Sequence, residues 1–383
     1  MEKHLVHLAY DCDSGKPDGR WEVWGHKPEI GYQPGGRCYS WLSDSRCQDS
    51  KSGCYLEVME VADFSVSGIE NVNFPEEKIE ALVAYNKDKG YVMDIGEVLR
   101  KGAGGFDVQF NPGRERRKGR LPGQVDDPDH AGCVLCAAIY SKVPEFIGWD
   151  DYCLFPNPYP IFRNHFTLIS MEHEDSGQVL TAKRIKDGID FFSKTRGVKM
   201  FFNGKGAGAS SPDHFHFQGF SYPMPLPVER FHAKEIASNK SIKVSRLTDY
   251  PATVFVVESD DAEKLIDGVY RITSSLGGLS DGAGLTHNVL FSGCGPHPDV
   301  YIFPRDSGKQ KSKHYKSKPA TIEMSGMLVM SDQNDIERYG DADMGALKHL
   351  VEDVLEEVTV PGEELSFLAD DLFWRCETIS LFS

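Results

Sequence analysis

The chain has 383 residues, 40% of them hydrophobic and 11% aromatic, which is enough for two domains or one large pseudo-symmetric unit. With 42 basic and 58 acidic residues the formal net charge is −16, which argues against nucleic acid as the main ligand and predicts a monomer or weak homodimer. The sequence contains no run of about 18 apolar residues, the length that a membrane-spanning helix needs. The first ten residues also lack the apolar region of a secretory signal, so we expect a cytoplasmic protein. Nine scattered cysteines, an odd number, argue against a disulfide framework.

The N-terminal segment, residues 1–75, is rich in Gly, Asp, Ser and Cys, and its irregular apolar spacing assigns it no role. Its cysteines Cys38, Cys47 and Cys54 form a loose cluster that could hold a metal but is more simply incidental. A helix is predicted to begin at Pro75, because a proline followed by glutamates is typical of a first helical turn.

Two similar runs of elements follow, so we predict a first half at 76–222, a linker at 223–240 and a second half at 241–383. The first run has a helix at about 179–195 and strands near 106–110, 153–155, 166–170, 198–203 and 214–221. Prolines 223, 225 and 227 predict a stiff linker. The second run has strands at 252–258, 287–291 and 300–303 and helices at 261–275 and near 343–358.

The most informative segment is a loop of small residues that leads into His214, His216 and Gln218 at alternate positions. In an extended segment, side chains two residues apart project from the same face. These three side chains should therefore line one face of a strand, with Phe215 and Phe217 buried on the other. Histidines at this spacing also occur as a metal pair or on a polar strand face.

The glycine-rich loop at 203–213 predicts a phosphate pocket. Its glycines let backbone N–H groups approach a phosphate closely, and Ser210 and Ser211 add hydroxyl donors. A neutral imidazole can attack phosphorus and hold the group as a phosphoramidate, provided that donors neutralise the charge on the oxygens. The loop and Gln218 together therefore favour catalysis over a metal pair.

A second cluster begins with Cys133 and Cys136, whose spacing lets both thiolates reach one tetrahedral ion; zinc prefers such sulfur ligands completed by histidines. The pair could instead be redox-active or consist of two unrelated buried thiols. A redox pair usually opens a helix in a thioredoxin-like unit, and the residues around Cys133 do not predict one.

The pattern His-x-His-x-Gln resembles the branch of the histidine-triad superfamily that holds galactose-1-phosphate uridylyltransferase, dinucleoside-tetraphosphate phosphorylases and GDP-hexose phosphorylases. This resemblance implies an α+β fold in which two histidine-triad-like half-domains with antiparallel sheets form an intramolecular pseudo-dimer. It implies that His216 becomes nucleotidylated and that Gln218 binds the phosphate. Asn203 and Lys205 approximate a phosphate-binding segment of the uridylyltransferases, whereas residues 217–229 look more like the GDP-hexose phosphorylases.

By the same resemblance, one zinc or iron ion would be held by Cys133, Cys136, His173 and His214, with His165 as the main competitor to His173. No organic cofactor is implied. The metal would anchor the residue two positions before the nucleophile and so pre-organise the strand.

The resemblance also implies a nucleoside pocket at Asn157 and Tyr159, although a proline-rich surface loop remains an alternative. Arg114 could neutralise a phosphate or belong to a solvated basic loop, and Arg163 is a further cation near the pocket. In the second half, Asn288 and Arg305 could contact the leaving group, or a core strand could simply end in a surface arginine.

The expected function is a nucleotidyltransferase or phosphorylase that acts on a nucleoside diphosphate-sugar by double displacement. The acceptor would be phosphate or a sugar 1-phosphate. The alternatives are a dinucleoside-polyphosphate phosphorylase and a nucleotide-binding or hydrolytic protein of the same fold.

Overall fold

The structure, a computed structural model, describes residues 5–10, 17–24, 76–118, 133–140, 145–173, 177–195, 197–238, 241–278, 284–293, 295 and 297–365. Two compact units divide the chain, Met1–Val66 and Ser67–Ser383. In the first unit, β1 (Leu5–Tyr10) pairs antiparallel with β2 (Pro17–Trp24). Cys38, Cys47 and Cys54 lie outside the described residues.

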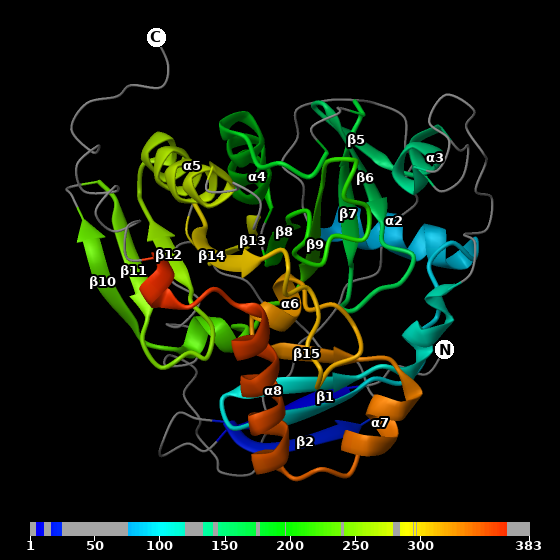
Figure 1. Cartoon of the computed structure of the whole chain (residues 1–383). Coiled ribbons are helices and arrows are strands. Elements are labelled where there is room, and N and C mark those ends of the chain that lie inside the picture. The colour runs from blue at the N-terminus through cyan, green and yellow to red at the C-terminus, as the bar shows by residue number, and fades with distance from the viewer. Residues whose placement is uncertain are drawn as a thin grey trace, which may run out of the picture. The chain divides into compact units, whose positions relative to one another are not determined.

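A ten-stranded sheet forms the centre of the second unit (Figure 1). Its strands are β5 (Ile147–Trp149), β6 (Tyr152–Pro156), β7 (Phe166–Ser170), β8 (Val198–Asn203), β9 (His216–Ser221), β10 (Ala233–Ser238), β11 (Lys243–Leu247), β12 (Phe255–Glu258), β13 (Leu285–Ser292) and β14 (Asp299–Asp306). They lie in the order β10-β11-β12-β14-β13-β8-β9-β7-β6-β5, and every neighbouring pair is antiparallel.

The order of elements in the sheet repeats once. Three strands, a helix and two strands (β5, β6, β7, α4, β8, β9) are followed by the same arrangement (β10, β11, β12, α5, β13, β14). The two sets meet at the centre, where β8 runs antiparallel to β13 and Asn203 lies opposite Asn288. This confirms the expected α+β fold of tandem half-domains with antiparallel sheets.

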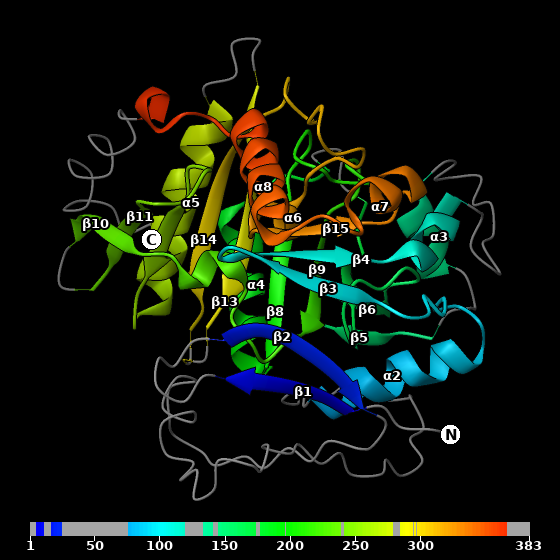
Figure 2. The same cartoon turned by 90° about the horizontal axis from the view of Figure 1, so that it is seen from below.

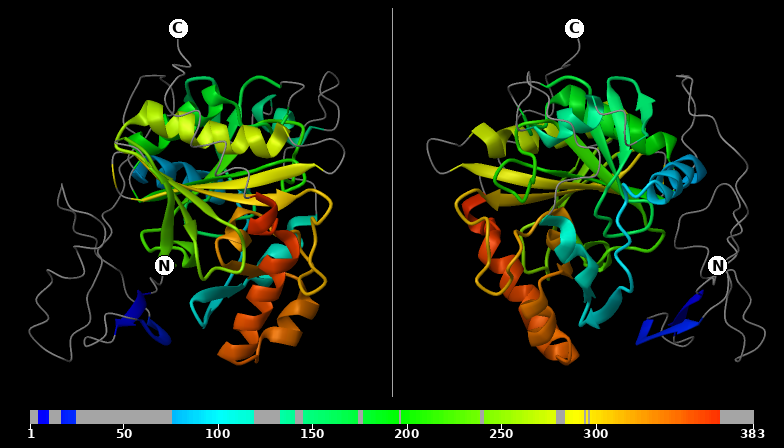
Figure 3. Two further views of the ribbon diagram at one scale, coloured as in Figure 1. Left: turned by 60° about the vertical axis from the view of Figure 1, so that its left-hand side comes forward. Right: turned by 90° about the vertical axis from the view of Figure 1, so that its right-hand side faces the viewer.

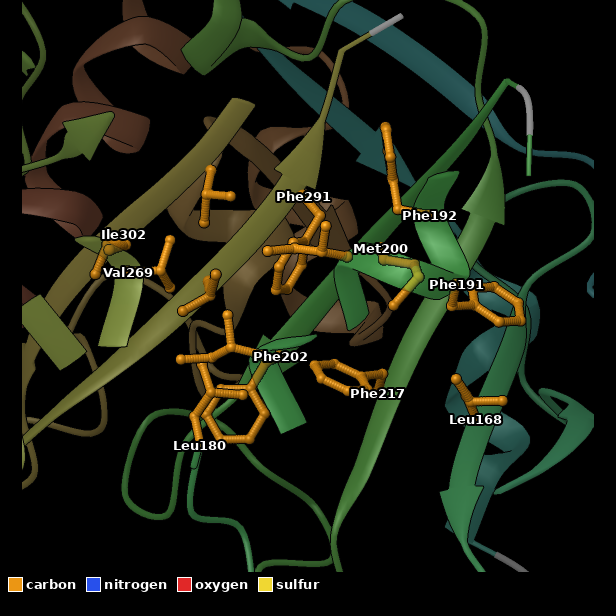
Figure 4. Packing of buried hydrophobic residues seen from close by; sticks show 14 of the residues in the cluster. Leu168, Leu180, Phe191, Phe192, Met200, Phe202, Phe217, Val269, Phe291 and Ile302 are labelled. Atoms are coloured by element: carbon orange, nitrogen blue, oxygen red, sulfur yellow. The ribbon is translucent and has the colours of Figure 1, made fainter. Parts of the chain in front are cut away.

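Helices α4 (Ala182–Lys194) and α5 (Ala262–Gly278) cover one face of the sheet (Figures 1 and 3). Thr181 caps α4 by accepting a hydrogen bond from the N–H of Arg184 at 3.3 Å. Between these helices and the strands lies an apolar cluster to which Phe191 of α4, Val269 of α5 and Phe217 of β9 belong (Figure 4). Since Phe217 points to the helices, His216 and Gln218 face the other side of the sheet, as predicted.

The opposite face is covered by α8 (Met344–Val358) and by a three-stranded sheet of order β15-β4-β3 (Figures 2 and 3). Its strands are β3 (Leu99–Ala103), β4 (Phe106–Phe110) and β15 (Met327–Met330), with β15 parallel to β4. Apolar residues of α8 recur at helical spacing and are buried. The remaining helices are α2 (Glu76–Asp88), α3 (Val134–Tyr140), α6 (Thr321–Met324) and α7 (Gln333–Tyr339), with short 3₁₀ turns at Pro112–Lys118, Pro227–Arg230 and Gly362–Leu365.

One region differs from the sequence-based expectation. The span predicted as a linker, 223–240, contains a 3₁₀ turn and β10, which extends the sheet by pairing with β11. β10 is an edge strand with few buried side chains, so it has little apolar alternation to reveal it.

Among the described residues, no helix combines the length and the apolar character needed to cross a membrane.

Candidate active site

His216 is the first residue of β9, and both its backbone N–H and its backbone carbonyl oxygen are hydrogen-bonded to one side chain. Its N–H donates to Oε1 of Gln178 at 2.8 Å, and its carbonyl oxygen accepts from Nε2 of the same side chain at 3.1 Å. Gln178 also donates to the carbonyl oxygen of Asn203 at 3.1 Å, so the end of β8 and the start of β9 are clamped together. The clamp leaves little freedom for the position of the imidazole.

The tautomer of His216 follows from its own contact. Nδ1 lies 3.0 Å from the carbonyl oxygen of His214, and because a carbonyl only accepts, Nδ1 carries the proton. Nε2 then has a free lone pair and no hydrogen-bond partner among the described residues. Burial lowers the pKa of His216 to about 4, so the ring is neutral at neutral pH and suited to nucleophilic attack.

Gln218 faces the same side, and His165 determines which end of its amide points away. The N–H of Ile161 donates to Nδ1 of His165 at 3.1 Å, so the proton of His165 lies on Nε2, which is 3.1 Å from Oε1 of Gln218. Asn157 adds a longer donation to the same oxygen at 3.4 Å. The amide nitrogen of Gln218 is therefore free to donate to a ligand, with no partner within the described part of the chain.

Burial, with the nearby charge of Arg114, lowers the pKa of His165 to about 3. The ring stays neutral, so its role as a donor to Gln218 does not change across the physiological pH range. His165 was expected only as a competing metal ligand; the structure instead bonds it to Gln218.

Asn203, at the end of β8, presents a second amide in the same way. Its Oδ1 accepts from Nδ2 of Asn288 at 2.8 Å, from the N–H of Thr321 at 2.9 Å and from Oγ1 of Thr321 at 2.7 Å. Its Nδ2 has no partner among the residues described here. Thr321 and Gln178 had no sequence signal, because their contacts join segments far apart in the chain.

Several predicted pocket residues are arranged differently from the expectation. The side chain of Asn157 is used within its own turn, where Oδ1 accepts from the N–H of Tyr159 at 2.9 Å. Tyr159 is half-buried, and its carbonyl oxygen accepts from the guanidinium of the buried Arg114. Arg163 is an exposed ion-pair partner of Glu80.

The loop after Asn203 also differs from a simple phosphate cradle. Lys205 forms an exposed ion pair with Asp213 at 3.1 Å, Ser210 is exposed and Ser211 is half-buried. Part of the glycine requirement is packing, since a Cβ at Gly208 (φ +87°) would come within 2.8 Å of the Pro319 carbonyl oxygen. The loop thus packs on the start of α6, and Lys205 remains at the surface.

A group of side chains that could hold a metal ion lies close to His216 in the chain. Cys133, Cys136, His173 and His214 offer ligand atoms that all lie within 4.8 Å of one another. Sγ of Cys136 is 3.0 Å from Nδ1 of His173 and 3.3 Å from Nδ1 of His214. A tetrahedral zinc site, with bonds of about 2.0 to 2.3 Å, separates its ligand atoms by roughly 3.3 to 3.8 Å, so this set is compact enough to surround an ion.

The protonation states also suit a metal. Nε2 of His214 lies 2.8 Å from the carbonyl oxygen of Ser170 and so carries the proton, which leaves the Nδ1 lone pair for an ion. The N–H of Cys136 donates to Sγ of Cys133 at 3.4 Å, which favours the thiolate form that binds a metal. Cys133 directly precedes α3, so the expectation that no helix opens here was wrong.

Comparisons with known proteins agree with this architecture. Residues 93–221 match the family model "Domain of unknown function (DUF4922)", and residues 227–364 match "GDPGP1-like, C-terminal domain". GDP-L-galactose phosphorylase 1 of Arabidopsis thaliana is 28% identical over 211 residues, which is 52% of this chain and 46% of that protein. GDP-L-galactose phosphorylase 2 of the same plant is 29% identical over 147 residues, 36% of this chain and 33% of that protein. The chain thus matches less than half the length of either relative.

A solved structure shares the fold. The yeast Ap4A phosphorylase Apa2 in complex with Ap4A superimposes with a TM-score of 0.54 at 18% identity, covering 76% of this chain and 98% of Apa2. The chain therefore shares the fold of Apa2, and in sequence it is similar to the two plant GDP-L-galactose phosphorylases and, over residues 227–364, to the GDPGP1-like C-terminal domain.

Proposed function

We propose that the chain is a nucleotidyl-transferring phosphorylase that acts on a nucleoside diphosphate-sugar through a covalent nucleotidyl-His216. The observation that carries the proposal is the free Nε2 of a buried, neutral imidazole, with amide nitrogens of Gln218 and Asn203 left unpaired among the described residues. A nucleophile beside donors for phosphate oxygens is what phosphoryl and nucleotidyl transfer need.

The first displacement forms a bond from Nε2 of His216 to the α-phosphorus and breaks the bond to the bridging oxygen, which leaves with the sugar 1-phosphate. That leaving group departs as an anion, so no general acid is required. In the second displacement an oxygen of inorganic phosphate attacks the same phosphorus, and the phosphorus–nitrogen bond breaks. The proton stays on Nδ1 throughout, donated in a hydrogen bond to the carbonyl oxygen of His214.

Gln218 and Asn203 would donate to the non-bridging oxygens, whose charge grows in the transition state. Inorganic phosphate as acceptor and a GDP-hexose as donor are supported by the names of the two plant relatives. Lys205 and Ser210, being exposed, would reach only the outer part of a bound substrate, and Ser211 lies beside them.

Zinc or iron would be held by Cys133, Cys136, His173 and His214. When bound, such an ion supplies a rigid anchor rather than a reacting group, because its four protein ligands close the coordination sphere. His214 would then hold β9 two residues before His216. No organic cofactor is needed for either displacement.

Intact-protein mass spectrometry after incubation with a GDP-hexose tests the nucleophile. We expect a nucleotidyl adduct on the wild type, no adduct on His216→Ala, and loss of turnover by several orders of magnitude in that variant. His287→Ala is the matched control, because His287 is also buried and neutral but packs against Phe202 on the helix-covered face, with ring centroids 5.6 Å apart. An adduct that persists in His216→Ala, or none on the wild type, contradicts the proposal.

A further inference from the structure

We propose that Arg305 and Asn288, from the second half, are positioning residues that fix the Asn203 amide with its nitrogen toward the phosphate attacked by His216. The inference rests on the proposed function and goes beyond it, because it gives the half without a nucleophile a defined part in the chemistry. Both residues were expected at the leaving group or the surface. Instead both side chains are fully buried, behind Asn203.

Arg305 is a buried cation without a carboxylate among its hydrogen-bond partners in the described residues. Its Nε donates to the carbonyl oxygen of Val358 at 3.0 Å, and Nη1 donates to that of Pro319 at 2.9 Å and to Oδ1 of Asn288 at 2.7 Å. Burial lowers its pKa to about 10 against the opposing effect of the Glu323 charge, which is not hydrogen-bonded to it, so the guanidinium is still charged at neutral pH. A hydrophobic side chain of similar size would usually serve packing at less cost, so the charge calls for a role other than packing.

The orientation of Asn288 follows from Arg305. A guanidinium only donates, so the Asn288 oxygen must face Arg305 and its nitrogen must face the other way. That nitrogen donates to Oδ1 of Asn203 at 2.8 Å and to the carbonyl oxygen of Ala207 at 2.7 Å. The donor and the acceptor of the Asn288 amide are thus both committed.

The orientation of Asn203 follows in turn. Its Oδ1 meets donors from Asn288 and from Thr321, and a flipped amide would set donor against donor at each contact. The three groups form a chain in which each N–H points to the next oxygen, from guanidinium to Asn288 to Asn203. Aligned hydrogen bonds of this kind polarise one another, and the first is charge-assisted, so the free N–H groups of Asn203 become better donors to an anion.

The contacts alone are also compatible with a purely structural role, here called a strut, in which Arg305 and Asn288 only connect β8 to β13. A double-mutant cycle on catalysis distinguishes this structural role from the positioning role. The four proteins are the wild type, Arg305→Met, Asn203→Ala and the double variant, each assayed for kcat, KM and melting temperature. We expect Arg305→Met to lower kcat about 10- to 100-fold with less change in KM, by analogy with the loss of one donor to a developing charge. In the Asn203→Ala background the same substitution should cost almost nothing in kcat while still lowering the melting temperature.

A strut would lower kcat by the same factor in both backgrounds, and that result overturns the proposal, as does an unchanged kcat in Arg305→Met. Lys199→Met is the matched control. Lys199 is a buried cation on β8 that also bridges to β13, by donating to Oγ of Ser292 at 2.6 Å, but it does not contact Asn203. Its effect on kcat should be the same with and without the Asn203 amide.

Should Arg305→Met not fold, Asn288→Asp carries the test. Aspartate keeps the shape of the asparagine side chain and still accepts a hydrogen bond from Arg305. It cannot donate to Asn203, and its carboxylate repels Oδ1 of Asn203. We expect this variant to lose kcat about as much as Asn203→Ala while its melting temperature falls little. Wild-type kcat in a folded Asn288→Asp protein refutes the proposal.

The same cycle, run on the affinity for GDP by calorimetry, separates this inference from the proposed reaction. If the wild type forms no nucleotidyl adduct, the reaction is refuted, and non-additive changes in GDP affinity between the Arg305 and Asn203 substitutions still support the positioning role. Additive changes, or no binding of GDP by the wild type, count against it.

Discussion

At the scale of single residues, the proposed reaction depends on which end of an amide faces the substrate. An amide nitrogen attracts a phosphate oxygen and an amide oxygen repels it, so a flipped Gln218 would oppose the reaction instead of assisting it. His165 is the neighbour that decides between the two, since its Nε2 proton can meet only the Gln218 oxygen. Asn157 adds a weaker constraint at 3.4 Å.

We therefore expect His165→Leu to lower kcat about 10- to 100-fold, with a smaller change in KM, because the freed amide samples both orientations. Steady-state kinetics and the rate of adduct formation on His216 provide the measurement. His287→Leu serves as control, since it removes a buried neutral histidine from the helix-covered face and should cost stability without slowing adduct formation. Normal adduct formation in His165→Leu would show that Gln218 needs no such partner.

At the scale of elements, the cysteine–histidine group brings together three segments of the chain that are far apart in sequence. Cys133 directly precedes α3 and Cys136 lies in its first turn, His173 follows β7, and His214 precedes β9. A metal bound there would stabilise the folded state by linking these three segments, and would restrain the strand that carries His216.

Gently purified protein should contain about one equivalent of zinc or iron, as expected of a closed four-ligand site. Cys133→Ser should lower metal content and melting temperature together, as measured by elemental analysis and thermal unfolding. Cys153→Ser is the control, because Cys153 is buried in β6 and burial raises its pKa to about 11, which makes it an unreactive thiol. Full metal content in a Cys133→Ser/Cys136→Ser protein would exclude the site.

At the scale of the whole molecule, the two halves share one sheet, and the second half lies next to the site through Asn288 and Thr321. The proteins that the chain resembles are named for two kinds of substrate, a nucleoside diphosphate-sugar and a dinucleoside tetraphosphate. The sequence relatives are GDP-L-galactose phosphorylases, whereas the structural neighbour is an Ap4A phosphorylase.

We expect a higher kcat/KM for nucleoside diphosphate-sugars than for dinucleoside tetraphosphates when both are assayed at the same phosphate concentration. A second series of assays replaces phosphate with a hexose 1-phosphate as the acceptor. Our reason is that the two plant proteins to which the chain is similar in sequence are both named GDP-L-galactose phosphorylases, whereas the 18% identity to the Ap4A phosphorylase shows the shared fold alone. A tenfold preference for the dinucleotide, about 1.4 kcal/mol in transition-state binding, would reverse this choice and leave the His216 chemistry unchanged.

The sequence by itself determined the strands and the face on which the chemistry lies. Residues 106–110, 166–170 and 198–203 form strands with the predicted bounds, and His216 and Gln218 lie on the face opposite Phe217. These features are local, because the face to which a side chain points in a strand depends only on its position relative to neighbouring residues. A strong apolar run in the sequence therefore indicates both the strand and its buried face.

Only the tertiary structure decided what each polar group does. The sequence allows Arg305 to be a surface residue at the end of a strand, but its side chain is fully buried. The sequence indicates Lys205 as a phosphate ligand, but its side chain is exposed and paired with Asp213. The amide of Asn203 is oriented by Asn288, 85 positions away, and that of Gln218 by His165, 53 positions away. Such pairings depend on the register between strands, which residue spacing within one segment does not encode.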